Sequence, residues 1–177
     1  MSMPPLLPVI KPEIPVGYRF IAVTLRDPAA PLAIMGWPTI RRDVAGGPEY
    51  SYPITPENVA ARIKQENLDV LSWRVIEYED IPEDRTYRDA LTDDGTKLKH
   101  DMPKAREIHR NHMRYARIHV LTALDIEYQR ADEQADAAAK ARIAAKKQAL
   151  RDLPASPEIE AATTTDDLKA FWPEALK

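Results

Sequence analysis

The chain has 177 residues, of which 44% are hydrophobic and 30% charged, with a net charge of −3 and no cysteine. The lack of cysteine excludes disulfides, thiolate metal sites and a cysteine nucleophile. The small net charge gives no argument for binding to nucleic acid or to a membrane surface, and no run approaches the roughly 20 apolar residues that span a bilayer. This length suits one domain, or a small domain with an appendage.

Residues 1–16 are rich in proline and are expected to form an extended arm. Prolines remove hydrogen-bond donors and restrict the backbone, which excludes a helix between Pro4 and Pro15. The stretch also lacks the basic start of a secretory signal. Apolar side chains on an extended arm often lie along another surface, in the same chain or in a partner; a frayed terminus is the alternative interpretation. The candidate partner-binding residues of the arm are Leu6, Leu7, Val9 and Ile10.

Residues 17–100 predict a small module of strands with one helix. Short runs rich in β-branched and aromatic residues are bounded by proline and glycine, as is typical of strands. Asp94-Gly95 predicts a tight turn. The expected strands cover residues 17–26, 32–37, 71–79 and 97–99.

The helix of this module is expected to begin at Thr55 as its cap, with Pro56 in the first turn. Proline is favoured there because its missing N–H has no partner inside the helix. The helix should run to about Glu66. Its inward residues should be Val59, Ala60 and Ile63.

Residues 101–153 predict two helices that fold back on each other. The stretch contains no glycine, and Asp101 can cap the first helix. A polar break at residues 132–136 separates the two helices, and amphipathic helices with a short connection usually pack together. Apolar residues at steps of three and four share one face of the first helix: Ala105, His109, Met113, Ala116, Val120, Leu124, Tyr128 and Ala131. The second helix has Ala139, Ile143, Leu150 and Leu153.

The remaining tail, residues 154–177, predicts one more short helix. Thr163-Thr164-Thr165 supplies a cap, Pro173 ends the helix, and Leu168, Phe171 and Trp172 should dock it on the body. The predicted fold class is therefore α+β. It consists of an extended arm (1–16), a small mixed module (17–100), a helical hairpin (101–153) and a tail with a short helix (154–177).

Four arginines form a stripe on the first long helix, and these are the second set of candidate partner-binding residues: Arg106, Arg110, Arg114 and Arg117. Their steps of four, four and three place them together. Such a stripe can bind an acidic protein surface or phosphates. The alternative is internal pairing, because residues 69–94 carry nine acidic residues against three arginines.

No residue is a convincing catalytic, cofactor or metal ligand, so we expect a protein that is not an enzyme and has no cofactor. The sequence has no glycine-rich phosphate loop and no serine in a nucleophile-elbow context. His109, His112 and His119 share one helix, but about two turns, or roughly 11 Å, separate His112 from His119, which is too far for one metal ion.

Residues 80–133 resemble a group of small proteins encoded in the tail regions of tailed bacteriophages and prophages. The pattern is an Ile-Pro-x-Asp-Arg-Thr-aromatic-Arg segment, an Asp-Gly turn, then Asp-Met-x-Lys-Ala-Arg-x-Ile-His-Arg and Leu-Asp-x-Glu. The matching residues are Ile81, Pro82, Asp84, Arg85, Thr86, Tyr87, Arg88, Asp94, Gly95, Asp101, Met102, Lys104, Ala105, Arg106, Ile108, His109, Arg110, Leu124, Asp125 and Glu127. The downstream Leu-Arg-Asp-x-Pro segment is also similar. One departure is Leu91, where the family often has tryptophan.

The resemblance implies a non-enzymatic protein that binds phage tail-fibre or receptor-binding subunits, as an assembly chaperone or an attached component. Its expected location is the bacterial host cytoplasm during assembly, or the virion if it is retained there. One alternative is a structural virion protein that anchors fibres, belongs to the collar or baseplate, or decorates the capsid. A second is a nucleic-acid-binding protein acting through the arginine stripe, for which the net charge gives no support. Partners would be virion proteins or further copies of the chain, with no membrane partner.

Overall fold

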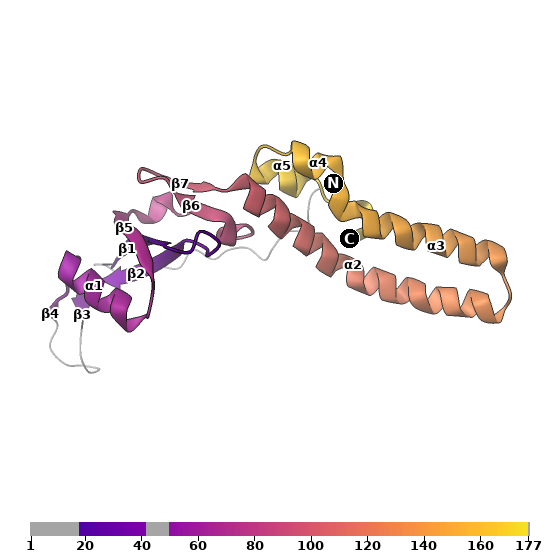
Figure 1. The fold of residues 1–177 in the computed structure, drawn as a ribbon, viewed down its shortest axis with the longest axis horizontal. Helices are drawn as coiled ribbons and strands as arrows, with labels where there is room; N and C mark the ends of the chain where they lie inside the picture. Colours follow the sequence, from indigo (N-terminus) through magenta and orange to yellow (C-terminus); the bar gives the residue numbers. More distant parts are fainter. Residues whose placement is uncertain (1–17, 42–49, 177) are drawn as a thin grey trace. The chain divides into compact units, whose positions relative to one another are not determined.

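The computed structural model describes residues 18–41 and 50–176, and it has the α+β fold class that the sequence predicts. The chain divides into two compact units between Asp101 and Met102. The first, here called the sheet unit, holds the strands of the described residues. The second, the helical unit, holds the long helices (Figure 1).

Three antiparallel strands form the main sheet, in the order β2-β1-β5. Ile21 at the centre of β1 lies opposite Met35 in β2 and Val75 in β5. The central strand is paired along both edges, and its residues Ile21, Ala22 and Val23 are all fully buried. The strand bounds are β1 Tyr18–Leu25, β2 Ala33–Pro38 and β5 Val70–Ile76.

Both faces of β1 pack against apolar side chains, because alternate residues of a strand point to opposite sides. Ile21 and Val23 join a cluster with Trp37 and Val59. On the other face Ala22 packs in a cluster that includes Ile76 and Ile81.

Helix α1, Pro56–Gln65, forms where the sequence predicts it. The Thr55 hydroxyl accepts the backbone N–H of Asn58 at 3.2 Å, and Val59 is fully buried. The expectation that Ala60 faces inward is wrong, since Ala60 is exposed. Arg62 turns towards the sheet instead, because it lies one turn after Val59. Its Nη1 donates to the Gly36 carbonyl at 2.9 Å, and its guanidinium lies 5.5 Å from the centre of the Trp37 ring.

Two further strand pairs complete the described part of the sheet unit: β3 Ile40–Arg41 with β4 Tyr50–Ser51, and β6 Leu91–Asp93 with β7 Leu98–His100. Strand β6 is missing from the sequence prediction. Its first residue, Leu91, is buried. Strand β7 begins one residue later than predicted.

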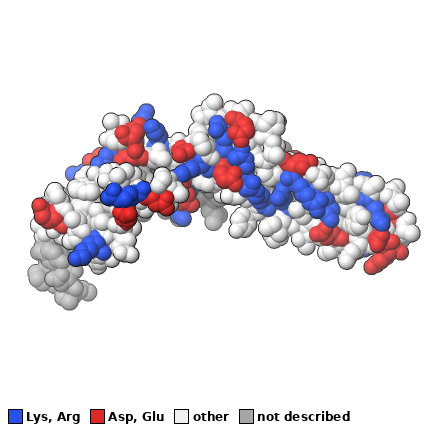
Figure 2. Space-filling view, in the orientation of Figure 1, with Lys and Arg blue, Asp and Glu red and all other residues white. Residues whose placement is uncertain are grey.

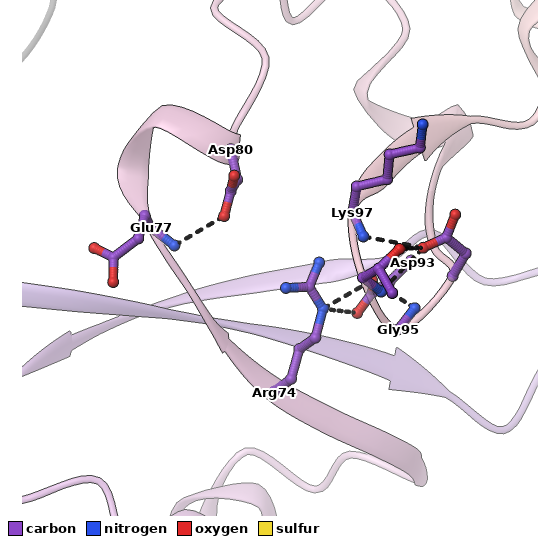
Figure 3. Close-up of polar contacts among 8 residues, drawn as sticks. Arg74, Glu77, Asp80, Asp93, Gly95 and Lys97 are labelled. Carbon is purple, nitrogen blue, oxygen red and sulfur yellow. Dashed lines mark hydrogen bonds and ion pairs between the residues drawn. The ribbon is translucent and has the colours of Figure 1, made fainter.

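The turn between β6 and β7 is held by carboxylates, as Figure 3 shows for Asp93. Asp93 accepts the Gly95 N–H at 3.1 Å. The Nε of Arg74 lies 2.9 and 2.8 Å from the two carboxylate oxygens of Asp93. Asp94 accepts the Thr96 hydroxyl at 2.7 Å and the backbone N–H groups of Thr96 and Lys97, each at 3.0 Å. These bonds, chiefly the one from the hydroxyl, lower the pKa of Asp94. Gly95 has φ +91°, a conformation that favours glycine. The predicted turn at Asp94-Gly95 is confirmed.

Short 3₁₀ turns fill the connection between β5 and β6: η1 Tyr78–Asp80 and η2 Arg88–Ala90. The Asp80 carboxylate accepts the Glu77 backbone N–H at 3.1 Å (Figure 3). This bond holds the start of η1. The sequence predicts instead that the strand continues to Glu79. The strand ends at Ile76, three residues earlier than expected.

In the helical unit, α2 Met102–Glu133 and α3 Ala137–Asp152 lie side by side and antiparallel, joined by a tight turn (Figure 1). The predicted hairpin is confirmed. None of the predicted apolar residues of α2 is exposed. No helix of residues 18–41 and 50–176 is long and apolar enough to cross a membrane. The fully or almost fully buried residues of the two helices are Ala105, His109, Met113, Leu124, Ala131, Ile143 and Leu150.

Two lysines of α3 fasten the outer half of the hairpin to α2. Lys147 pairs with Asp125, and Lys140 pairs with Asp132. Both ammonium groups also lie over the Tyr128 ring, at 5.4 and 5.6 Å from its centre. The pairing with Asp132 raises the pKa of Lys140.

The chain after α3 consists of short elements with buried apolar residues. Thr164 caps α5 through a capping box: its hydroxyl accepts the Asp167 N–H at 3.1 Å, and the Asp167 carboxylate accepts the Thr164 N–H at 2.9 Å. Leu168 and Trp172 are buried and Phe171 is partly buried, as the docking prediction requires. The bounds are η3 Leu153–Ala155, α4 Pro157–Ala161, α5 Thr165–Ala170 and η4 Glu174–Leu176.

Candidate functional site

The four arginines of the α2 stripe divide into two pairs with different roles. Arg106 and Arg117 donate to backbone carbonyls at the ends of other helices. The Nη2 of Arg106 bonds the carbonyl of Ala162, the C-cap of α4, at 2.9 Å. The Nη1 of Arg117 bonds the carbonyls of Leu150 and Arg151 in the last turn of α3, at 3.3 and 2.9 Å. These carbonyls have no partner inside their own helix, so the two arginines stabilise the helical unit.

Arg110 and Arg114 bind carboxylates instead. Arg110 pairs with Glu160 and lies 3.4 Å from Glu107, and Arg114 lies 2.6 Å from Glu107. These bonds, chiefly the one from Arg114, lower the pKa of Glu107. Arg114 also donates to the side chain of Asn111 at 2.6 Å.

The partners of the stripe lie within the helical unit. Within the sheet unit, the acids of residues 69–94 pair with arginines and with Lys99. Asp69 pairs with Arg26 at 3.0 Å, and Glu77 pairs with Arg19 at 3.1 Å. The sequence showed the excess of acid there but could not show which bases reach it.

Between α2 and the segment that follows α3 the helical unit has an open groove of about 630 Å³. We call it the arginine groove. Figure 2 shows the Lys and Arg side chains gathered in a band over this half of the chain, with acidic groups interspersed. Four arginines and two glutamates line the groove. The lining residues are Glu107, Arg110, Arg114, Arg117, Arg151, Pro154, Ala155, Ser156 and Glu160.

A second surface feature of the helical unit is an exposed apolar row on α2. Its members are Tyr115, Ile118 and Ile126, with 75%, 51% and 49% of their surfaces exposed. Their spacing, with Thr122 between, places them on the side of the helix away from the buried residues. The sequence prediction missed this row, although steps of three and four link it as they link the core face. In the sheet unit, Leu71 and Val75 of β5 are also exposed.

The histidines of α2 have unlike surroundings. His109 is fully buried, and its Nε2 lies 3.1 Å from the Phe171 carbonyl. His112 is half-buried, and burial lowers its pKa. His119 is exposed. Nowhere in residues 18–41 and 50–176 are three or more His, Asp or Glu side chains grouped so that they can hold a metal ion.

The other candidate residues, Leu6, Leu7, Val9 and Ile10, lie outside the described residues. Gly46-Gly47-Pro48, whose glycines and proline are typical of a loop, also lies outside them.

The residues that carry the phage-protein pattern mostly build the fold. Ile81 and Tyr87 are buried in the sheet unit, and Ala105 and His109 are buried in the helical unit. The Asp-Gly pair forms a turn, and both arginines of the second motif are hydrogen-bonded within the helical unit. Many residues of the pattern thus have a role in the fold.

Comparison of the whole chain with protein-family models, with curated proteins and with solved structures finds no match.

Proposed function

We propose that this chain is a non-enzymatic bacteriophage tail-region protein that binds tail-fibre or receptor-binding subunits, as an assembly chaperone or as an attached component. The resemblance of residues 80–133 supports the phage assignment. The exposed apolar row on α2 is the observation that supports protein binding. The proposed location is the bacterial host cytoplasm, or the virion if the chain stays bound.

The row favours a protein partner because exposing apolar side chains to water costs free energy, and a partner that covers these side chains removes that cost. Covering a large apolar side chain contributes about 1.5–3 kcal/mol, and aromatic residues are common at the centres of interfaces. Tyr115, Ile118 and Ile126 span about three turns of one helix, the spacing by which a helix face binds a groove or another helix. A matching strip on a fibre subunit would cover all three.

Co-purification from cells that express this chain with the fibre protein of the same phage tests the proposal. The variants Tyr115→Ser, Ile118→Ser and Ile126→Ser should each reduce the recovered fibre protein while circular dichroism shows an unchanged fold. Leu71→Ser replaces an equally exposed apolar residue in the sheet unit and should leave recovery unchanged. Recovery that is lost only in Leu71→Ser would place the interface on the sheet unit and contradict the role of the row.

Copies per virion separate a chaperone from a structural component. Quantitative mass spectrometry of purified particles should find the chain absent if it acts only in assembly. Stoichiometric copies would support the alternative, a structural virion protein that anchors fibres, belongs to the collar or baseplate, or decorates the capsid. If the chain neither binds the fibre protein nor occurs in particles, both assignments fail.

A further inference from the structure

The arginine groove has hydrogen-bond donors that its internal ion pairs do not use. A guanidinium carries five N–H donors. In Arg114 and in Arg117, Nη1 is the donating atom of each hydrogen bond to the described residues, and the other guanidinium nitrogens are unused there. Arg151 is exposed and its guanidinium makes no bond in this part of the chain. Three arginines that line one open groove therefore have unused donors.

The internal contacts of the groove indicate which chemical group its arginines can bind. Glu160 comes from α4, while the arginine that it pairs with comes from α2. A carboxylate on a separate segment is thus already bound by the groove. Arginine forks bind carboxylates in two parallel hydrogen bonds, and such charge-assisted bonds are about twice as strong as neutral ones.

We propose that the arginine groove binds side-chain carboxylates of an acidic protein segment, with Arg114 and Arg151 as the principal contacts. Arg117 bonds the last turn of α3 and stabilises the site, while Arg110 becomes available to the incoming acid when its pair with Glu160 opens. This site is separate from the apolar row and does not depend on the phage assignment, because it follows from the charges of the groove alone.

Carboxylates suit the groove better than a nucleic-acid backbone does. A nucleic acid carries a negative charge on every nucleotide, so it would meet Glu107 and Glu160 in the same groove. An acidic peptide has charges on flexible side chains and can place them beside the arginines only. The pairing of Lys140 and Lys147 with aspartates further along the hairpin also interrupts a continuous positive track.

Glu160 should compete with the incoming acid for Arg110. Its side chain is largely exposed, so the internal pair contributes little to folding. A bound segment can therefore replace it. Neutralising Glu160 should strengthen binding rather than weaken it, which a purely structural role of the groove does not predict.

Fluorescence polarisation with the purified full chain tests the site. The probe is a labelled peptide of about ten residues that alternates glutamate and serine, at about 50 mM salt, since ionic contacts weaken as salt rises. Arg114→Gln and Arg151→Gln should each weaken binding about five- to tenfold. Glu160→Gln should strengthen it about threefold. Arg142→Gln removes an exposed α3 arginine outside the groove and should change nothing.

Three results would overturn the proposal. The first is no binding of the peptide by the folded wild-type chain. The second is an equal loss in Arg142→Gln and in the groove variants, which would indicate unspecific attraction. The third is tighter binding of a single-stranded oligonucleotide of similar charge than of the peptide, which would assign the groove to nucleic acid. A glutamine-serine peptide serves as the neutral reference, and circular dichroism confirms that each variant is folded.

Discussion

His109 is buried in the helical unit, where its Nε2–H donates to the Phe171 carbonyl and its ring meets Trp172 edge to face at 5.7 Å between centres. Burial lowers the pKa of His109, and the nearby His112 and Arg110 lower it further, although the bond to Phe171 acts in the opposite direction. The folded state therefore favours the neutral form of the His109 imidazole. The resemblance pattern includes this residue, and its buried position explains why a histidine can serve the fold rather than chemistry.

Acid should destabilise the helical unit through His109. Its pKa in the folded chain lies below the ordinary value of 6.5, so the unfolded chain binds the proton first. Stability is fully present above about pH 6.5 and is lost as the pH falls through the lower, folded-state pKa. Urea unfolding at about pH 7.5 and about pH 5 should show this loss. His109→Gln keeps a donor for Phe171 but cannot titrate, and it should lose less stability on acidification.

The control for this prediction is His119→Gln, which replaces an exposed histidine of the same helix. It should keep the wild-type dependence on pH. If His109→Gln also keeps that dependence, another group is responsible. The half-buried His112, whose pKa is lowered as well, is then the next to replace.

The Arg74–Asp93 pair should matter more than other ion pairs of the sheet unit. The side chains are 24% and 8% exposed, and the pair raises the pKa of Arg74. Asp93→Ala also removes the acceptor for the Gly95 N–H and should lower the free energy of unfolding by about 1–3 kcal/mol. Asp89→Ala removes an exposed partner of Arg88 and should change it by less than about 0.5 kcal/mol. Equal effects in urea unfolding would contradict the argument from burial.

At the scale of elements, helices α1 and α2 end in the same way. After α1, the Leu68 N–H donates to the Ile63 carbonyl and the Asn67 N–H donates to the Lys64 carbonyl. After α2, the Asp136 N–H donates to the Ala131 carbonyl and the Ala135 N–H to the Asp132 carbonyl. These paired bonds define a Schellman motif, which needs a left-handed residue. Asn67 and Ala135 both have φ 54°. Asparagine tolerates this conformation well, whereas alanine does not.

Ala135→Gly should therefore stabilise the hairpin. Glycine adopts the left-handed conformation without the steric cost of a Cβ, so we expect a gain of about 0.5–1 kcal/mol. Ala144→Gly places the same change in the interior of α3 and should cost about 1 kcal/mol, because glycine is a poor helix former. Thermal unfolding of the two variants should shift in opposite directions. A loss of stability in both would show that the turn is not strained.

The elements that local chemistry specifies were predictable from the sequence. Thr55-Pro56 begins α1, Thr164 caps α5, and the steps of three and four define the core face of α2. Strand β6 was not predictable, because three residues carry too little periodicity. The early end of β5 was not predictable either. The Glu77 N–H bonds the Asp80 carboxylate, whereas a longer strand would continue to pair with β1.

At the scale of the whole molecule, each compact unit has its own buried core, so each should lose its structure separately. Trp37 is buried, its Nε1 donates to the Tyr52 carbonyl at 3.0 Å, and its ring stacks on Tyr52 at 4.9 Å between centres. Trp37→Ala should cost about 3–5 kcal/mol and unfold the sheet unit first.

Circular dichroism and tryptophan fluorescence during heating measure this separation. In Trp37→Ala most far-ultraviolet ellipticity should persist after the sheet unit unfolds, because α2 and α3 lie in the other unit. Leu168→Ala, in the core of the helical unit, should produce the opposite order. A single transition, in which all signals are lost together in both variants, would show that the units unfold as one.

The α+β class, the hairpin and the arginine stripe were predictable from the amino-acid sequence, because prolines, caps and apolar spacing act over a few residues. The groups that those arginines bind depend on the tertiary structure. Arg117 reaches carbonyls of α3, and Arg110 pairs with Glu160, fifty residues away. Spacing shows which side chains share a helix face, but the groups that meet that face depend on how distant segments pack. The arginine groove, which also includes Arg151 and Ser156, exists only through that packing.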